Sequence, residues 1–259
     1  MKIGLIADIH GNIQALTAVL AQLYAAQVDM VLCAGDLVGY GAHPNAVIEL
    51  LRSCGIPSVA GNYDAAVAWQ WPQASRHPTS PATECLQQAA LDWVKQTVHS
   101  KHKDYLRSLP LAMQYRLDNL SLHILHAGPN HLDEWVTPDQ SDDLVHLAAC
   151  IKADVVILGH THTAFVHESV GYMGNKTLFI NPGAVGRALD GDTRAAYAIF
   201  DTVSRQVTLK RVAYDLEIAV RAVMNSGMPV EIALLLQHGV GCLEQIPQMP
   251  LAMLEVNRV

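Results

Sequence analysis

The first twelve residues, MKIGLIADIHGN (residues 1–12), organise the interpretation of the whole chain. A short apolar run over residues 3–7 ends abruptly in a polar segment that contains Asp8 and His10. We expect a buried strand that ends at a site, because strand tips that feed short loops are where open α/β sheets bind ligands. On extended backbone, side chains two residues apart point the same way. A carboxylate and an imidazole that converge suit a divalent transition metal, provided that the rest of the chain supplies matching ligands.

The bulk composition limits the class of protein. The chain has 259 residues, 51% of them hydrophobic, which suffices for a substantial core in one large domain or two small ones. Its formal net charge is −7 and it has no block of Lys and Arg, so strong binding to a nucleic-acid backbone is not expected. A small anionic substrate held by metal is compatible with this acidic balance.

The cysteines and apolar runs bear on location. Five cysteines are scattered along the chain without a C-x-x-C pair, which argues against a disulfide framework and for a reducing compartment. Asp8 follows too few apolar residues for a signal-peptide core, and no apolar run approaches the length of a membrane span. We therefore expect a soluble cytoplasmic protein that does not bind a membrane.

The residues after the first strand predict a βαβ unit. Asn12 is a good helix N-cap, and apolar residues recur at helical spacing over 16–23. Residues 29–34 then read as a second buried strand, which ends just before Asp36. A strand, a helix and a strand within this length imply parallel strands and a right-handed crossover.

The next third of the chain predicts a change from strands to helices. A helix over 44–51 precedes a short third strand over 56–60, which ends before Asn62. From about 65 to 111 the chain is rich in Trp, Pro, Gln and His, and we expect a helical insertion. Either this insertion is a lid over the strand tips, or it is a plain helical crossover.

The second half predicts further strands that end in histidines. A hairpin with a turn at 118–119 precedes His126, and a buried strand over 155–158 precedes His160 and His162. A helical tail follows from about 215 to 259, with a loose end. The other expected elements are a helix over 140–150, strands over 164–170, 176–180, 195–201 and 206–212, and helices over 216–224 and 230–238.

Polar side chains thus gather after strands in five separate segments. One carboxylate between two sets of ligands can bridge two cations about 3.5–4 Å apart, and such a pair clamps a phosphoryl group and holds a water or hydroxide. The candidate metal ligands are Asp8, His10, Asp36, Asn62, His126, His160 and His162.

The order of these motifs resembles the calcineurin-like metallophosphoesterase superfamily. The chain has D-x-H, G-D-x-x-G, G-N-x-D, a lone His after a strand, and G-H-x-H, in that order and at similar spacing. N-P-G-A-V-G at 181–186 is similar to an element of the small prokaryotic phosphodiesterase branch. The resemblance implies a mixed α/β fold, a four-layer αββα sandwich of two mixed sheets, in one domain over residues 1–259.

The resemblance also implies a chemistry. It is hydrolysis of a phosphoester, most favourably a phosphodiester, by in-line attack of a hydroxide that bridges two divalent transition metals. Mn is favoured, and Fe, Zn, Co and Ni suit the same ligands. The implied ligands are Asp8, His10 and His162 on one ion, Asp36 between both ions, and Asn62, His126 and His160 on the other.

Other functions stay open beside this one. The same residues are compatible with a phosphomonoesterase or protein phosphatase, or with a weakly active protein-binding scaffold on the same fold. A nuclease of the repair type is disfavoured by the missing basic surface. A small, nucleotide-like phosphoester is the expected substrate class, and an oligomer is compatible with the sequence.

Tyr63 is a departure from the pattern of the superfamily. Many members have a histidine here, as a proposed general acid for the leaving oxygen. A phenol with a reference pKa near 10 can donate a hydrogen bond but matches proton transfer near neutral pH poorly. We therefore expect weak dependence on a general acid and a preference for good leaving groups.

A second departure lies at Arg187 and Leu189, where related proteins carry Gln and Arg. Arg187 can contact a substrate phosphate as a forked donor. Alternatively, it can pair with Asp190 or Asp192 as a structural clamp.

Several side chains outside the motifs have two interpretations each. Trp69 and Trp71 can form an aromatic wall for a nucleobase, but packing inside the insertion is the favoured interpretation. Tyr40 and His43 can line the rim of the pocket. The histidines outside the motifs are expected to be solvated or internally satisfied rather than metal ligands.

Overall fold

The computed structural model describes residues 1–75, 80–139, 141–172 and 174–246. The first sheet has four strands in the order β2-β1-β8-β9. Strand β1 (Lys2–Ile6) runs parallel to β2 (Met30–Cys33) and antiparallel to β8 (Ala195–Asp201), which pairs antiparallel with β9 (Gln206–Val212). Helix α1 (Ile13–Ala25) connects β1 to β2, as the βαβ prediction requires.

The second sheet has five strands in the order β3-β4-β5-β7-β6. Strand β4 runs parallel to β5, and β5 runs parallel to β7, while the edge strands β3 and β6 pair antiparallel with their neighbours. Both sheets are therefore mixed. The bounds are Ala112–Leu117 for β3, Leu120–Leu125 for β4, Val155–Ile157 for β5, Phe165–Val170 for β6 and Lys176–Asn181 for β7.

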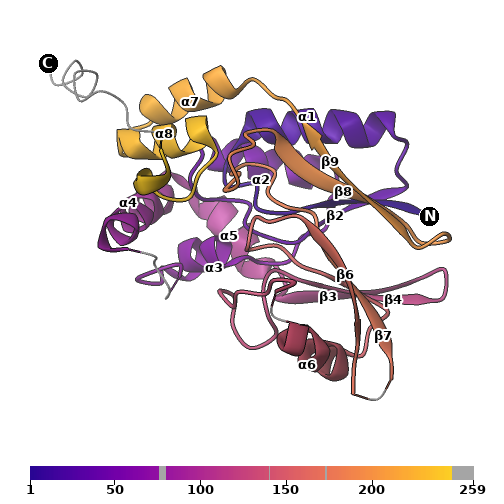
Figure 1. The fold of residues 1–259 in the computed structure, drawn as a ribbon. Helices are drawn as coiled ribbons and strands as arrows, with labels where there is room; N and C mark the ends of the chain where they lie inside the picture. Colours follow the sequence, from indigo (N-terminus) through magenta and orange to yellow (C-terminus); the bar gives the residue numbers. More distant parts are fainter. Residues whose placement is uncertain (76–79, 140, 173, 247–259) are drawn as a thin grey trace, which may run out of the picture.

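The helices lie outside the two sheets (Figure 1). Helices α1, α2, α7 and α8 lie on the side of the first sheet, and α6 covers the second. The bounds are Pro44–Ser53 for α2, Asn62–Trp69 for α3, Pro81–Thr97 for α4, Ser100–Ser108 for α5, Ser141–Ile151 for α6, Leu216–Met224 for α7 and Val230–His238 for α8.

The core has one apolar layer between the sheets and one outside each sheet. Leu5 of β1 and Phe200 of β8 are buried against Ile124 of β4 and Ile157 of β5, which packs the sheets face to face. Burying such side chains stabilises the fold by about 1.5–3 kcal/mol each. The four-layer αββα sandwich of two mixed sheets is thus confirmed.

The predicted strand over residues 56–60 is wrong. This stretch makes a single parallel bridge, between Cys33 and Ser58, and no ladder. Pro57 has no N–H to donate, so only its carbonyl oxygen bonds to the first sheet, accepting from the Cys33 N–H. Asn62 consequently does not follow a strand but is the first residue of α3.

The other predicted elements match within a few residues. Asn12 caps α1, its Oδ1 accepting from the N–H of Ala15 at 3.0 Å. Asp118 and Asn119 are both left-handed, as the tight turn between β3 and β4 requires. The loose end of the tail and the start of the helix predicted from residue 140 lie outside the described residues.

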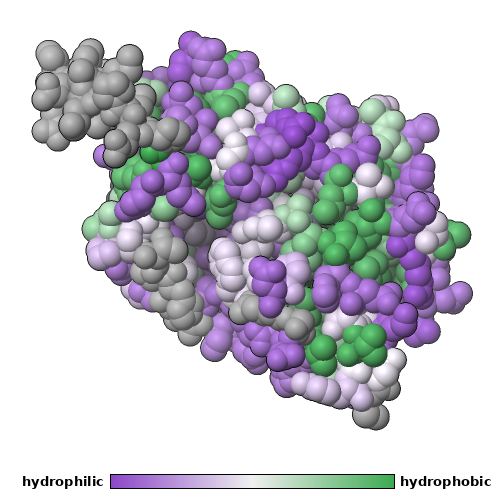
Figure 2. Space-filling model, in the orientation of Figure 1, coloured by the Kyte–Doolittle hydropathy of each residue, from purple (hydrophilic) through white to green (hydrophobic). Residues whose placement is uncertain are grey.

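The surface mixes polar and apolar residues. Figure 2 shows hydrophilic residues spread over the visible face, with smaller apolar patches between them. Within the described ranges, the helices are all too short or too polar to cross a membrane.

Candidate metal centre

The loops after β1, β2, β4 and β5 and the start of α3 converge on one site. They bring all the predicted metal ligands together, although the ligands come from five separate segments of the chain. Among the described residues, two groups of three side chains can hold a metal ion, and in each group the ligand atoms lie within 4.8 Å of one another.

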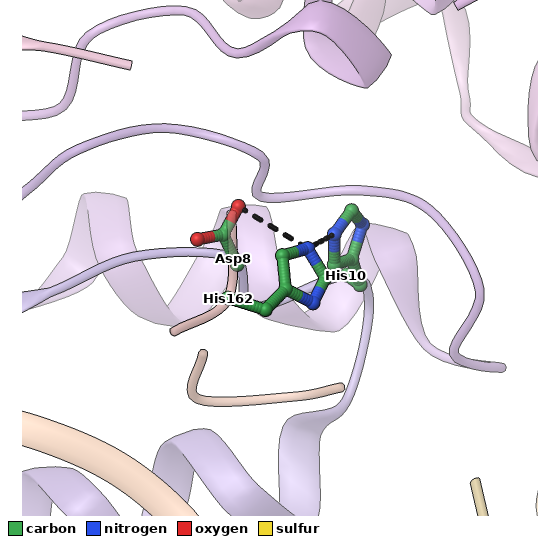
Figure 3. A group of neighbouring side chains, drawn as sticks. All are labelled: Asp8, His10 and His162. Atoms are coloured by element: carbon green, nitrogen blue, oxygen red, sulfur yellow. Dashed lines mark hydrogen bonds and ion pairs between the residues drawn. The ribbon is translucent and has the colours of Figure 1, made fainter. Parts of the chain in front are cut away.

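The first group consists of Asp8, His10 and His162, all buried (Figure 3). The Nε2 atom of His162 lies 3.6 Å from Oδ1 of Asp8 and 3.1 Å from Nε2 of His10. One carboxylate and two imidazoles therefore face a common point, in agreement with the set that the resemblance implies for one ion.

The second group contains Asp8, Asp36 and His126. Asn62 joins it, because its Oδ1 lies 2.9 Å from Nε2 of His126 and 3.2 Å from Nδ1 of His160. The Nδ2 group of Asn62 donates to the carbonyl oxygen of Ala74 at 3.1 Å, which orients the amide oxygen toward the imidazoles.

Asp8 belongs to both groups, and Asp36 of the second group also approaches the first. The Oδ2 atom of Asp36 lies 3.6 Å from Nε2 of His10 in the first group and 3.5 Å from Nε2 of His126 in the second. The Oδ1 atom accepts from the N–H of Tyr63 at 2.9 Å. One oxygen of Asp36 is thereby held by backbone, and the other lies between both sets of imidazoles.

The backbone explains how the side chains converge, and it corrects the sequence-based argument. Strand β1 ends at Ile6, so Asp8 and His10 do not lie on extended backbone. Both have positive φ values, 53° and 47°, in the left-handed region. Asp36, His160 and His162 have positive φ values as well. Such conformations cost of order 1–3 kcal/mol each and concentrate at functional sites.

Hydrogen bonds between the loops offset this strain. The N–H groups of Ile9 and His10 both donate to the carbonyl oxygen of Asp36 at 2.9 Å, and that of Gly186 donates to the carbonyl oxygen of Asp8 at 2.9 Å. Gly186 has to be glycine, because an added Cβ would lie 1.8 Å from the carbonyl oxygen of Ile9. The segment 181–186 therefore supports the loop that carries Asp8.

Three imidazoles are oriented by backbone carbonyl groups. Nδ1 of His10 lies 3.2 Å from the carbonyl oxygen of Val38, Nδ1 of His126 lies 2.7 Å from that of Ala34, and Nδ1 of His162 lies 2.6 Å from that of Arg187. Because a carbonyl only accepts, each Nδ1 is the protonated nitrogen, and each neutral ring turns the lone pair of Nε2 into the site. This is the arrangement that metal-binding histidines have.

The ionisable groups fit a bound cation. Burial lowers the pKa of His126 to about 4, and it lowers those of His10 and His162 well below their usual value, so these rings are neutral. Burial raises the pKa of Asp36 to about 8, and burial with the nearby Asp36 raises that of Asp8. Buried carboxylates beside converging lone pairs are costly unless a cation compensates them, so the residues present fit a divalent metal.

A comparison with protein families shows which family the chain belongs to. The model of the calcineurin-like phosphoesterase superfamily domain matches residues 1–205. The chain belongs to this superfamily. An uncharacterized protein of Methanocaldococcus jannaschii is 32% identical to it over 239 residues, which cover 88% of this chain and 93% of that protein.

Two solved structures have the same fold as this chain. The crystal structure of a metallophosphoesterase from Sphaerobacter thermophilus is 30% identical and covers 93% of this chain and 100% of its own, with a TM-score of 0.74. A hypothetical protein from Pyrococcus horikoshii has a TM-score of 0.78 at 20% identity, over 92% of this chain and 98% of its own.

Two residues of the superfamily motifs act as supports that the sequence did not identify. The carboxylate of Asp64, in G-N-x-D, accepts from the N–H groups of Leu37, Val38 and Gly61, and so joins the loop after β2 to the start of α3. Its place at the third position of a helix, after Gly61, is the available signal, since a carboxylate there closes a capping box.

Asn181 is the second such support. Its Nδ2 donates to the carbonyl oxygen of Gly159 at 2.8 Å and to Oγ1 of Thr161 at 3.0 Å. Its Oδ1 accepts from the N–H of Gly183 at 2.9 Å. The side chain is fully buried, and it holds the loop that carries His160 and His162.

A cavity of about 500 Å³ opens at the candidate metal ligands of this chain. Tyr63 lies in its wall, and its hydroxyl group donates to that of Tyr40 at 2.5 Å. Burial and the neighbouring Tyr40 raise the pKa of Tyr63 well above its usual value, so it stays a neutral phenol. Tyr40 is thus part of the cavity wall, whereas His43 is the N-cap residue of α2.

Arg187 lies in the same wall. Its guanidinium carbon is 3.8 Å from the centre of the Tyr40 ring, and Nη2 donates to the carbonyl oxygen of Gly241 at 3.4 Å. Asp190 and Asp192, the alternative partners, form ion pairs with Arg211 and Arg194. The contacts around Arg187 therefore favour a role in the cavity over the clamp.

The wall also contains residues without a sequence signal. Trp135 lies edge-on to His160, with ring centres 5.6 Å apart. Thr83 and Gln87 of α4 line the cavity as well, so one helix of the predicted insertion borders the site. A lone Trp and two polar helix positions carry no periodic pattern that would have indicated this.

Proposed function

We propose that the chain is a phosphodiesterase that hydrolyses a small phosphoester with two divalent transition metal ions. Such a pair, when bound, lowers the pKa of a water and neutralises charge that builds on the phosphoryl oxygens. Mn²⁺ is the ion that we propose, and Fe, Zn, Co and Ni suit the same nitrogen and oxygen ligands.

The observation that carries the proposal is the position of Asp36. Its Oδ2 atom is nearly equidistant from His10 and His126, at 3.6 and 3.5 Å. A carboxylate oxygen between two sets of neutral imidazoles is what a pair of bridged cations requires. We assign Asp8, His10 and His162 to one ion and Asn62, His126 and His160 to the other, with Asp36 between them.

The cavity residues define what the chain itself contributes to the reaction. Arg187 places a guanidinium group at the cavity beside the ligands, where it can hold a non-reacting phosphate oxygen. Tyr63 brings a neutral hydroxyl group, which can donate a hydrogen bond but not a proton near pH 7. A leaving group must then depart with little help, which favours diesters with good leaving groups.

The experiment that tests this proposal is a matrix of metals and substrates. Apo-protein is reloaded with each metal in turn and assayed on bis(4-nitrophenyl) phosphate and on 4-nitrophenyl phosphate. We expect Mn²⁺ to support hydrolysis and the diester to be hydrolysed faster. A faster monoester would make the protein a phosphomonoesterase, and no turnover with any metal would favour a protein-binding scaffold.

The cysteines and the net charge bear on the compartment and on the substrate class. All five cysteines lie within the described residues and are free, which supports a reducing compartment, and we propose the cytoplasm. The formal net charge of −7 disfavours long nucleic acids as substrates, so a small phosphoester, such as a nucleotide derivative, is the proposed ligand.

A further inference from the structure

A second cavity, of about 670 Å³, adjoins the metal centre. Its walls come from the end of α3, the segment after it, α5 and the loop around residue 131. Ligand pockets for small molecules have volumes of about 300–1,000 Å³, so this cavity is large enough for one. We call it the tryptophan cavity, because Trp69 and Trp71 line it.

The tryptophans do not pack inside the helical segment, which corrects the favoured sequence-based interpretation. Trp69 is 59% exposed and Trp71 is 42% exposed. Leu111 lies in the same cavity and is 62% exposed. Large apolar side chains that gather exposed in one concave place mark a binding site more often than a single exposed residue does.

The tryptophan cavity adjoins the cavity at the candidate metal centre, and the two share wall residues. Asn62 and Asp133 line both cavities. Asn62 holds its amide oxygen 2.9 Å from Nε2 of His126, so the tryptophan cavity begins at the second group of metal ligands. A substrate whose phosphate lies at that group can extend into this cavity.

The lining chemistry favours a flat, uncharged ring over another phosphate. Arg107, the only Arg among the described residues that line the cavity, already donates to Asp104 at 2.6 Å and to the carbonyl oxygen of Ala68 at 2.9 Å. Its guanidinium carbon also lies 5.9 Å from the centre of the Trp69 ring. The exposed side chains of Trp69 and Trp71 line the cavity, and indole rings bind planar aromatic groups by stacking.

We propose that the tryptophan cavity is a subsite for the nucleobase of a nucleotide-derived phosphodiester. This rests on the proposed function, because it places the phosphate of the same substrate at the metal centre. Asn130 and His131, which also line the cavity, provide an amide and an imidazole near the position of such a base. Stacking on aromatic side chains tolerates every base, so we assign the class and not one base.

The test compares two esters that differ only in the base. One is the 4-nitrophenyl ester of thymidine 5′-phosphate, and the other is the same ester of the abasic deoxyribose 5-phosphate. Both release 4-nitrophenolate, so their leaving groups are identical. We expect kcat/KM to be roughly tenfold higher for the thymidine ester, within the range measured for stacking of one base on an aromatic side chain, and mainly through KM.

Variants then assign the preference to the cavity. Trp69→Ala and Trp71→Ala should each reduce the ratio of kcat/KM between the thymidine and abasic esters toward one. Tyr24→Ala is the matched control, because Tyr24 is an exposed aromatic residue on α1, outside the cavity, and its loss should leave the preference intact. Binding of thymidine 5′-monophosphate and of the abasic sugar phosphate to the metal-loaded protein is measured by calorimetry in parallel.

The outcomes separate this inference from the proposed function. Equal kcat/KM for both esters in the unmodified protein, with turnover, overturns the subsite and keeps the phosphodiesterase. A thymidine preference that survives both tryptophan substitutions overturns it too. If neither ester is hydrolysed, the proposed function fails, and the calorimetry decides: base-dependent binding that Trp69→Ala removes supports the subsite, and base-independent binding overturns it.

Discussion

The metal centre and the tryptophan cavity share a wall but are built in opposite ways. Most side chains of the candidate metal centre are buried, and five of the seven lie at loop positions with positive φ values. Backbone groups hold most of these side chains in place by hydrogen bonds. The tryptophan cavity is lined by the exposed side chains of Trp69, Trp71 and Leu111, together with buried ones such as Leu106. Asn62 belongs to both, at the start of the same helix that ends at Trp69.

This difference separates two tasks. The loops are joined to one another by hydrogen bonds that Asp64 accepts and that Asn181 and Gly186 donate, so we expect a change in one loop to displace candidate ligands in others. The tryptophans have no such role in the centre. Damage to the candidate metal centre should therefore reduce turnover of every substrate by the same factor, whereas damage to the tryptophan cavity should change which substrate is preferred.

Asp36→Asn is expected to have the largest effect. It keeps the shape of the side chain but removes the carboxylate charge that lies between His10 and His126. We expect kcat/KM to fall on the order of a thousandfold, the upper range for loss of one group that stabilises the transition state. The loss should be equal for the thymidine and abasic esters, and metal analysis should find fewer ions per chain.

The control for this variant is the stability of the apo-protein. Because burial raises the pKa of Asp36 to about 8, its charged form is costly without metal, and a neutral Asn should not lower the melting temperature. Asp92→Asn, on the exposed side of α4, should change neither activity nor stability. Full activity of Asp36→Asn would refute the shared-ligand arrangement.

Asn181→Ala should have the next largest effect, although Asn181 is not itself a predicted ligand. Removing its amide leaves the carbonyl oxygen of Gly159 without this donor and frees the loop that carries His160 and His162. Loss of such a support typically costs about 10–100-fold in metal affinity or activity. We expect activity at limiting Mn²⁺ to fall by that factor and to recover partly at high Mn²⁺.

Asn225→Ala, at the exposed end of α7, is the matched control for the loss of an amide side chain. It should leave the dependence of activity on Mn²⁺ unchanged. If Asn181→Ala behaved like Asn225→Ala, the loops of the metal centre would be less interdependent than their hydrogen bonds indicate.

The same difference decides what could be predicted from the sequence. Strands and helices follow from local periodicity, and the predicted ligands follow from short motifs such as D-x-H and G-H-x-H, so both were predictable. The reason given for the convergence of Asp8 and His10 was wrong, however, because left-handed backbone, not strand alternation, aims these side chains. Positive φ values in non-glycine residues depend on contacts with other loops, and no local pattern encodes them.

The tryptophan cavity could not be predicted from the sequence. Tryptophans in a helical segment are compatible with a core or with a wall, and only the three-dimensional packing separates these alternatives. Trp135 was missed for the same reason, because its contact with His160 joins segments without a common motif. Similarly, Pro57 removes a donor, and whether its stretch still pairs as a strand depends on the neighbouring segment.

A smaller effect is expected from pH on the apo-protein. Asp36 has a folded pKa of about 8, above its unfolded value near 4, so its contribution to stability is complete below about pH 4 and is lost as pH rises through 8. His126 has a folded pKa of about 4, below its unfolded value near 6.5, so its contribution is present above 6.5 and is lost as pH falls through 4.

The two contributions oppose each other between pH 4 and 6.5, and above 6.5 only the carboxylate effect remains. The melting temperature of the apo-protein should therefore fall between pH 6.5 and 8. Mn²⁺ at a hundred times its dissociation constant adds about 2.7 kcal/mol of stability, so loading should raise the melting temperature by roughly 5–10 °C. The gain in melting temperature on loading should grow with pH. An apo-protein that becomes more stable from pH 6.5 to 8 would contradict the raised pKa of the buried Asp36.

Tyr63→Phe should have the smallest effect. It tests a wall residue of the cavity at the candidate metal centre that is neither a predicted metal ligand nor part of the tryptophan cavity. The substitution removes the hydroxyl group that donates a hydrogen bond to Tyr40, and it keeps the ring. General acids contribute about 10²–10⁴-fold, and a neutral phenol should contribute far less, so we expect a loss below about tenfold. The loss should be larger for a diester with a poor leaving group, such as the methyl ester of thymidine 5′-phosphate, than for the 4-nitrophenyl ester. Tyr115→Phe on β3 is the control, and a hundredfold loss in Tyr63→Phe alone would show that this phenol does act as the acid.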